Sequence, residues 1–334
     1  MLNNLDILRA FAVTCVLVAH IIKIGFGVNH PALNELGYFG VLAFFVHTSI
    51  VLMRSLDRTP PAGRWTVFYV RRFFRIYPLS ITVILILLAI NSVAVNSVLL
   101  PNQATMSVGD IVANLLLIQN LTDSLNVTGP LWSLPYEVQM YLVLPYIHEV
   151  ISGSTSLKPV AAMLTVMAAL NGVLFVASGW HPITQYFPCF LCGVLAHQLL
   201  KKRLAFLPGR LWPVWLLALM VPSVIPWLSF FEWRSSRDTL ICLVLAVTVA
   251  CFKDVPSGRL SAAASTVAKY SYGVYLLHMP LILFCFQYLK PAQAVSLALF
   301  CVLCTALPFA AYHCIEAPMM AYGRTNRRPV PVSA

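Results

Sequence analysis

Charged side chains are scarce in this chain. Asp, Glu, Lys and Arg make up 10% of its 334 residues, whereas about a quarter of the residues in a soluble domain are charged. The chain also lacks a polar linker, an internal repeat and a low-complexity tract, and 60% of its residues are hydrophobic. One soluble core cannot bury that much apolar surface, but helices that are apolar on every face can span a bilayer. We therefore expect an all-α fold, a polytopic transmembrane helical bundle.

Several signatures of soluble enzymes and metal proteins are missing as well. The sequence contains no Gly-rich phosphate loop, no HExxH and no GxSxG. Two CxxC pairs, Cys189/Cys192 and Cys301/Cys304, lie within apolar segments, and no second pair at zinc spacing accompanies either one. We interpret the nine cysteines as buried thiols and predict no metal site. The net charge of +11 comes from short basic clusters between apolar runs, so we expect no nucleic-acid partner.

Ten apolar runs are long enough to span a bilayer. They are 5–24, 37–53, 76–99, 132–150, 159–178, 183–200, 211–230, 239–253, 270–289 and 294–315. The first is not preceded by a basic segment or followed by a cleavage site of small residues, so we expect a retained helix rather than a signal peptide. A shorter run, 108–120, ends in polar residues and is predicted to be a half-helix or interfacial segment.

Charge counting sets the predicted orientation. If 108–120 does not span and the N-terminus is cytoplasmic, 18 Lys and Arg lie inside and four lie outside, namely Lys23, Arg234, Arg237 and Lys290. If 108–120 does span, the split becomes 10 against 12. The positive-inside rule favours the first arrangement, with both termini cytoplasmic and 100–131 as an outer loop. We predict one transmembrane domain over 1–320 and a short basic tail over 321–334.

Ionisable residues within the first helix mark a candidate site. Arg9 and His20 are eleven residues apart, so both face one side of the helix, about 16 Å apart along its axis. Asp6 is close enough to Arg9 in sequence to pair with it. Intramembrane charges mark function more often than packing, and we predict a polar cavity with His20 and Arg9 as catalytic residues. Alternatively, Arg9 reaches the membrane surface and His20 bonds a neighbouring carbonyl.

Two further segments carry polar groups at the ends of apolar runs. Arg72, Arg75 and Tyr77 lie in the segment before and at the start of the third run, and the guanidinium groups there can bind phosphate oxygens. A positive-inside function explains Arg71 and Arg72 equally well. Glu137, one turn before Tyr141, is predicted to lie just inside the outer membrane face as a catalytic or substrate-contacting carboxylate.

Residues for an acceptor substrate are predicted near that carboxylate and in the second run. Trp132 and Tyr136 flank the start of the helix that carries Glu137, and His47 adds an imidazole within the second helix. We predict Trp132, Tyr136 and His47 to be substrate-binding residues. His278 is interpreted as a buried helical histidine with satisfied hydrogen bonds, and Glu316 as a structural partner of the arginine cluster.

Taken together, these segments resemble the acyltransferase-3 family of multi-pass membrane acyltransferases. The matching motifs, in the family's order, are Leu5-Asp6-x-x-Arg9 with His20; Gly40-Val41 with Phe44-Phe45-Val46; Arg72-x-x-Arg75-Ile76-x-Pro78; Trp132-Ser133-Leu134-x-x-Glu137; Ser271-Tyr272-Gly273-x-Tyr275-Leu276-x-His278-x-Pro280; and Ile315-Glu316-x-Pro318. The chain departs from the family at 47–50, where His-Thr-Ser-Ile replaces the usual Ser-Gly-aromatic step.

The resemblance implies an O-acyltransferase of a bacterial inner membrane. Its partners would be acetyl-CoA or another acyl-CoA as donor, a carbohydrate or lipid-linked glycan as acceptor, and membrane lipid around it. We predict Arg72, Arg75 and Tyr77 to be the residues that bind the acyl-CoA. A secondary transporter of a glycan precursor or small anion is the alternative, because intramembrane Arg, His and Glu would serve it equally well. Transporters often show two matching halves, but the second half of this sequence contains no repeat of the Arg9 and His20 segment.

Overall fold

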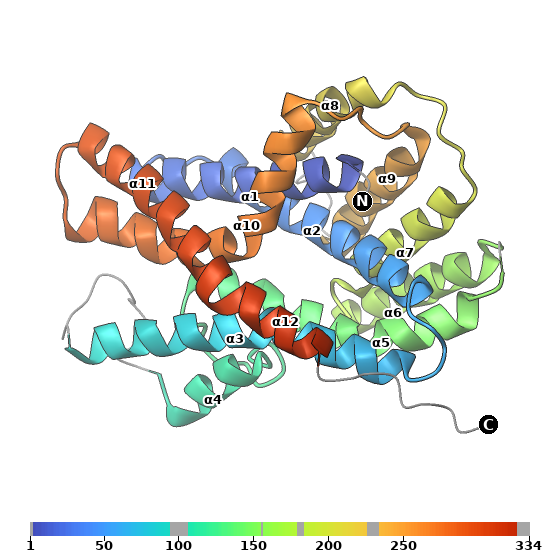
Figure 1. The fold of residues 1–334 in the computed structure, drawn as a ribbon, viewed down its shortest axis with the longest axis horizontal. Coiled ribbons are helices and arrows are strands. Elements are labelled where there is room, and N and C mark those ends of the chain that lie inside the picture. Colours follow the sequence, from blue (N-terminus) through green and yellow to red (C-terminus); the bar gives the residue numbers. More distant parts are fainter. Residues whose placement is uncertain (1–2, 94–105, 155, 179–183, 226–233, 326–334) are drawn as a thin grey trace.

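The fold is known from a computed structural model, which describes residues 3–93, 106–154, 156–178, 184–225 and 234–325. Within these ranges the chain is almost entirely helical and holds no β-strand beyond one isolated bridge between Leu207 and Phe252 (Figure 1). The predicted all-α fold is therefore confirmed. Parts of three predicted spans (94–99, 183 and 226–230) and residues 326–334 of the predicted tail lie outside the described residues.

The described residues form twelve α-helices. They are α1 (Asn3–His20), α2 (Pro31–Asp57), α3 (Arg64–Val93), α4 (Val108–Leu116), α5 (Leu134–Ile151), α6 (Lys158–Ser178), α7 (Phe187–Lys201), α8 (Trp212–Val224), α9 (Arg234–Cys251), α10 (Arg259–Ile282), α11 (Gln293–Ala311) and α12 (Ala317–Thr325). Short turns of π-helix extend α1 (η1, Ile21–Gly25), α10 (η6, Leu283–Tyr288) and α11 (η7, Tyr312–Glu316). Two 3₁₀ turns, η3 (Gly129–Ser133) and η4 (Gly209–Leu211), lead into α5 and α8.

Several helices suit a bilayer by length and composition. Asn3–Gly25, Pro31–Asp57, Arg64–Ile90 and Gln293–Arg324 are each long and apolar enough to cross it. Shorter apolar helices lie within α6, α7 and α8. The chain is thus an integral membrane protein. The count of ten spans stays a prediction, because α7 has 15 residues and a span ordinarily needs about 20.

The ambiguous segment 108–120 contains only a short helix. In α4 the Ser107 hydroxyl accepts from the Asp110 N–H at 3.1 Å, while the Asp110 carboxylate accepts from Ser107 at 2.7 Å. The Ser107 hydroxyl also donates to the Asp110 carboxylate at 2.8 Å, and this bond together with that from the Ser107 N–H lowers the pKa of Asp110. The helix ends where Leu117 adopts a left-handed conformation with φ 55°. At nine residues it is about 13 Å long, too short to cross a hydrocarbon core of about 30 Å.

The centre of the bundle is formed by α1, α2, α7 and α10. Helix α1 packs along both α2 and α10, and α2 packs along α7. Two glycines allow the close contacts on α2: a Cβ on Gly40 would lie 2.5 Å from the Ala12 carbonyl oxygen, and one on Gly193 would lie 2.5 Å from that of Val46. Small residues at such crossings let membrane helices approach closely. Arg9 and His20 on α1 are therefore held against both neighbouring helices.

Candidate active site

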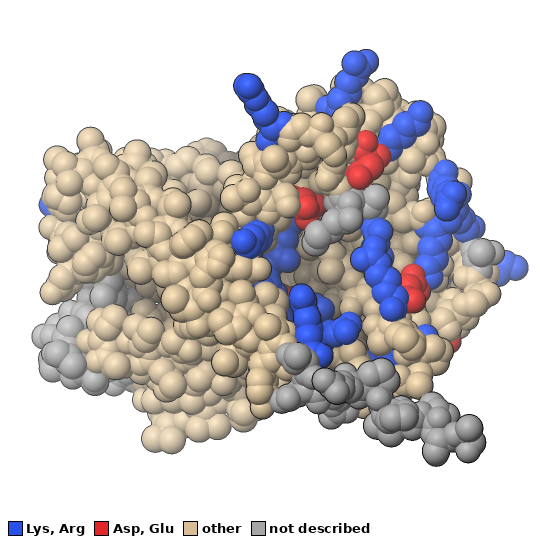
Figure 2. Space-filling model, viewed as in Figure 1, with Lys and Arg blue, Asp and Glu red and all other residues tan. Residues whose placement is uncertain are grey.

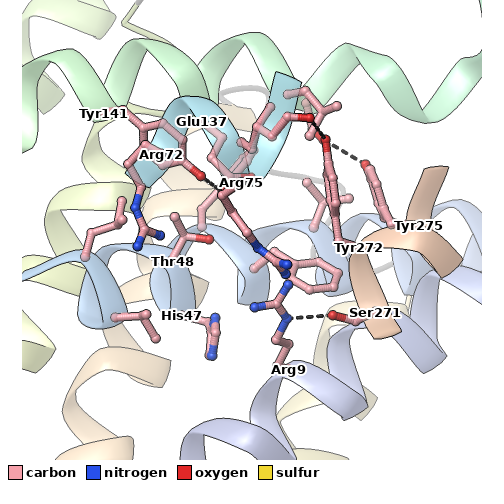
Figure 3. Close-up of a pocket in the computed structure, with 18 residues that line it drawn as sticks. Arg9, His47, Thr48, Arg72, Arg75, Glu137, Tyr141, Ser271, Tyr272 and Tyr275 are labelled. Carbon is pink, nitrogen blue, oxygen red and sulfur yellow. Dashed lines mark hydrogen bonds between the residues drawn. The ribbon is translucent and has the colours of Figure 1, made fainter. Parts of the chain in front are cut away.

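A polar cavity lies where α1, α2, α3, α5 and α10 meet. Its volume is about 80 Å³, and we call it the central cavity. The polar side chains around it are Arg9, His47, Thr48, Arg72, Arg75, Ser133, Glu137, Tyr141, Ser271, Tyr272 and Tyr275. Figure 3 shows Arg9, Arg72 and Arg75 approaching it from three different directions. The cavity that the sequence predicted beside Arg9 is therefore present in the structure.

Arg9 is held by α10 rather than by its own helix. Its Nε donates to the Ser271 Oγ at 2.6 Å, and that hydroxyl donates to the Ala268 carbonyl at 2.8 Å. The predicted pairing with Asp6 is wrong, since the described residues contain no ion pair between the two and Asp6 is buried elsewhere. The guanidinium of Arg9 thus faces the central cavity without a carboxylate bonded to it.

Arg75 has the structural partner that the sequence suggested. Its Nη1 lies 2.5 Å from the Glu316 Oε2, and its guanidinium lies 5.5 Å from the centre of the Tyr272 ring. Glu316 is 1% exposed. Tyr77 points away from the cavity and donates to the Leu116 carbonyl at 3.0 Å. The reason is the helical period: Tyr77 is two residues, or about 200°, from Arg75 around α3.

Glu137 on α5 and Arg72 on α3 both line the central cavity. The Tyr141 hydroxyl donates to the Glu137 carboxylate at 2.5 Å. The Nε of Arg72 is buried and has no hydrogen-bond partner among the described residues. An unpartnered guanidinium N–H is a binding position for an anionic ligand. With Arg75 paired to Glu316, the positive charges of Arg9 and Arg72 exceed the single charge of Glu137.

A second cavity opens beside the first and is strongly basic. It has a volume of about 390 Å³ and is lined by Arg54, Arg58, Arg71, Arg72 and Arg324, with no carboxylate among its lining residues. We call it the arginine vestibule. It shares His47, Val51 and Arg72 with the central cavity, so the two adjoin. In the view of Figure 2, Lys and Arg side chains gather over the right half of the molecule, and few lie over the left half.

A third cavity adjoins the central cavity on its other side. Its volume is about 240 Å³, and its lining includes His20, Tyr38 and Trp132. We call it the aromatic cavity. It shares Val41 and Tyr275 with the central cavity. The Tyr275 hydroxyl donates to the Pro130 carbonyl at 3.0 Å, which fixes the ring between the two spaces.

Rings from four elements surround the aromatic cavity. Trp132 stacks on Tyr38 with centroids 6.1 Å apart and planes 13° apart. The Tyr38 hydroxyl donates to the buried carboxylate of Asp238 at 2.6 Å. Tyr136 lies edge-on to Tyr186 at 4.8 Å and lines none of the three cavities. Of the two predicted aromatic contacts, the structure therefore places Trp132 beside the cavity and Tyr136 behind it.

One pairing at this site was not predicted from the sequence. His278 on α10 lies against His20, with 3.2 Å between its Nε2 and the His20 Nδ1. The sequence shows only that His278 follows Ser271 by seven residues on nearly the same helical face. That Ser271 contacts Arg9, and so brings this face to α1, is known from the structure alone. The predicted residues are thus divided between cavities. Arg9, Arg72, Arg75 and Glu137 line the central cavity, His47 lines its junction with the vestibule, and His20 and Trp132 line the aromatic cavity.

Three adjoining cavities with polar linings inside an apolar helical bundle are typical of membrane enzymes and transporters, in which buried charges are kept for function. Comparison with known proteins distinguishes the two classes. The model of the acyltransferase-3 family, an acyltransferase domain, matches residues 2–313, and the chain belongs to this family. It is therefore a membrane enzyme that transfers acyl groups.

Similarity to individual proteins agrees with this assignment. The chain is 26% identical over 313 residues to the acyltransferase MdmB of Streptomyces mycarofaciens, an alignment that covers 84% of this chain and 79% of the relative. No solved structure matches the chain.

Proposed function

We propose that the protein is an O-acetyltransferase that takes an acetyl group from acetyl-CoA at the cytoplasmic side and transfers it to a hydroxyl of an extracytoplasmic glycan. The observation that carries the proposal is the series of adjoining cavities, which has five arginines at one end and aromatic rings at the other. The arginine end suits a donor with an anionic head group. The aromatic end suits an acceptor that has an apolar face and polar edges.

The arginine vestibule fits the donor. The nucleotide portion of CoA carries several phosphate charges, and guanidinium groups bind phosphate oxygens in a forked geometry. Arg54 comes from α2, Arg58 follows the end of that helix directly, Arg71 and Arg72 come from α3, and Arg324 comes from α12. Among the described residues that line this space there is no carboxylate, so an anion entering it meets mainly guanidinium groups. Arg9 would then hold an anionic or polar part of the donor deeper in the bundle.

The aromatic cavity fits a carbohydrate acceptor. Aromatic rings with polar neighbours offer an apolar face and hydrogen-bonding groups within one pocket. Trp132 would stack on a sugar ring, and Asn34, also in the lining, would contact its hydroxyls. Glu137 lies beside Arg9 in the central cavity rather than beside Trp132, so we assign it to the donor side of the reaction.

His20 is the residue to which we assign the chemistry. Acyl transfer to an alcohol requires that the hydroxyl lose its proton as the oxygen attacks, and a neutral imidazole can accept that proton. His20 lines the cavity where the acceptor would arrive, on the face of α1 that also carries Arg9. The thioester would therefore pass from the vestibule through the central cavity toward His20. His47, at the vestibule junction, is the second candidate base.

The proposed direction of transfer requires a defined orientation. We place both termini in the cytoplasm and the protein in a bacterial inner membrane, with the loop that contains α4 outside. A reporter fused after Asn126 should then lie outside, and one fused after Lys202 should lie inside. Equal readings from these two fusions would contradict the orientation.

Deletion of the gene tests the proposed activity. Mass spectrometry of surface and exported glycans should show acetyl groups in the parent cells that are lost from the deletion strain and restored by the wild-type gene. Glycans that keep all their acetyl groups but accumulate on the cytoplasmic side would instead indicate a transporter.

A further inference from the structure

The second histidine at the site, His278, is a buried residue to which the proposed chemistry assigns no part. It is 1% exposed and lies on α10, 258 residues from His20 in sequence. Its ring contacts that of His20, with centroids 5.1 Å apart. A packing function alone would not need a polar side chain in this apolar environment, because burying an imidazole is favourable only when its nitrogens are hydrogen-bonded.

Hydrogen bonds to the backbone determine which nitrogen of His278 carries the proton. Its Nδ1 lies 2.8 Å from the Tyr275 carbonyl oxygen and 3.3 Å from that of Val274. A carbonyl oxygen can only accept, so Nδ1 must be the donor. In a neutral imidazole the other nitrogen is then an acceptor. The Nε2 of His278 therefore presents a lone pair toward His20.

The same reasoning then assigns the proton on His20. Its Nδ1 lies 3.2 Å from the Nε2 of His278, and two acceptors cannot share a hydrogen bond, so the His20 Nδ1 must donate. The proton of neutral His20 is thereby placed on Nδ1, and its Nε2 keeps the lone pair. That is the nitrogen left for the aromatic cavity, which His20 lines.

We propose that His278 is a positioning residue for His20: it fixes His20 as the Nδ1–H tautomer, aims its Nε2 lone pair at the acceptor hydroxyl, and supports the charge that His20 gains. This inference rests on the proposed acyl transfer. The chain of contacts runs from the Tyr275 carbonyl through His278 to His20. A base oriented through its second nitrogen is the arrangement that activates nucleophiles in unrelated enzymes.

In the proposed step a proton moves from the acceptor hydroxyl to the CoA sulfur by way of His20. The His20 Nε2 takes the proton of the acceptor hydroxyl as the oxygen forms a bond to the thioester carbonyl carbon. The carbon–sulfur bond then breaks, and the CoA sulfur leaves with the electron pair and receives that same proton from Nε2. While His20 is an imidazolium, its Nδ1–H donates to the His278 Nε2, which stabilises the positive charge. The products are the ester and free CoA thiol, and both histidines return to their neutral tautomers.

Two substitutions at position 278 separate positioning from packing. His278→Ala removes the acceptor nitrogen, whereas the side-chain carbonyl of His278→Gln can still accept from the His20 Nδ1. Removing an orienting partner costs from about tenfold to about 10⁴-fold in other sites. We expect kcat to fall about 100-fold or more in His278→Ala and by less than about tenfold in His278→Gln, with KM for acetyl-CoA unchanged in both.

The tautomer of His20 supplies a readout that does not depend on turnover. Imidazole ¹⁵N spectra of the full-length protein in bilayers, compared with those of His20→Ala, identify the two nitrogens of His20. We expect a protonated Nδ1 in the wild type and a shift of the proton toward Nε2 in His278→Ala. His313→Gln serves as the matched control, because His313 lies on η7 and lines none of the three cavities; it should change neither kcat nor the two ¹⁵N signals of His20.

The outcomes distinguish this inference from the proposed function. Turnover is measured as thiol release from acetyl-CoA with envelope glycans isolated from the deletion strain. If His20→Ala is inactive while His278→Ala keeps a normal kcat, the assignment of His278 is wrong and the acyl transfer through His20 stands. A proton on Nε2 of His20 in the wild type would also overturn the assignment. If both alanine variants turn over normally, the base assignment itself fails.

Discussion

Arg72 offers the sharpest test of donor binding. It lines both the vestibule and the central cavity, and its Nε has no hydrogen-bond partner among the described residues. A hydrogen bond to a charged group contributes about 1.5–3 kcal/mol. Because about 1.4 kcal/mol corresponds to a tenfold change, Arg72→Gln should weaken binding of CoA by about 10- to 150-fold.

Arg64→Gln is the matched control for that substitution. Arg64 lies on the same helix but lines none of the three cavities. Its Nη1 pairs with the Glu149 Oε1 at 2.9 Å. The Arg64→Gln substitution removes the same charge from α3. Ion pairs near the surface contribute less than about 1 kcal/mol to stability, so the variant should stay folded. Calorimetric titration of CoA into each purified variant should show weakening with Arg72→Gln alone. Equal affinities, or an equal loss in both variants, would refute the assignment of phosphate binding to the vestibule.

Two further predictions concern stability. Glu316→Gln leaves a partly buried arginine cation without its carboxylate, so thermal unfolding in detergent should reveal a loss of about 3–5 kcal/mol; an unchanged Tm would contradict the importance of this pair. Gly193→Ala places a methyl group 2.5 Å from a backbone oxygen of α2 and should cost about 1–3 kcal/mol. Gly258→Ala, whose Cβ would have no atom within 4 Å, is its control, and equal effects would count against the packing.

Helical periodicity predicted the parts of the site that lie on one element. The interval between Arg9 and His20 placed both on one face of α1, and the structure has both lining adjoining cavities. The short run at 108–120 was separated correctly from the long spans by its length and polar end. Periodicity also explains the misplaced Tyr77, which shares a segment with Arg75 but not a face.

Contacts between distant segments could not be predicted in this way. Nothing in the local sequence of α1 indicates that His20 meets a residue 258 positions away. The vestibule was likewise hidden, because Arg54 and Arg58 lie far from Arg324 in the sequence and each is explained by the positive-inside rule alone. Glu137 was expected beside Trp132, but the 3₁₀ turn η3 ends between them and directs the two side chains to different cavities.

We propose above all that His20 acts as the base for acetyl transfer from a donor in the arginine vestibule to an acceptor in the aromatic cavity. The most direct measurement is a single turnover of purified protein in lipid nanodiscs, with labelled acetyl-CoA and envelope glycans from the deletion strain. We expect wild-type protein to move label into the glycan with stoichiometric release of CoA thiol, and His20→Ala to bind CoA with normal affinity but to transfer no label. Transfer by His20→Ala at the wild-type rate would contradict the claim.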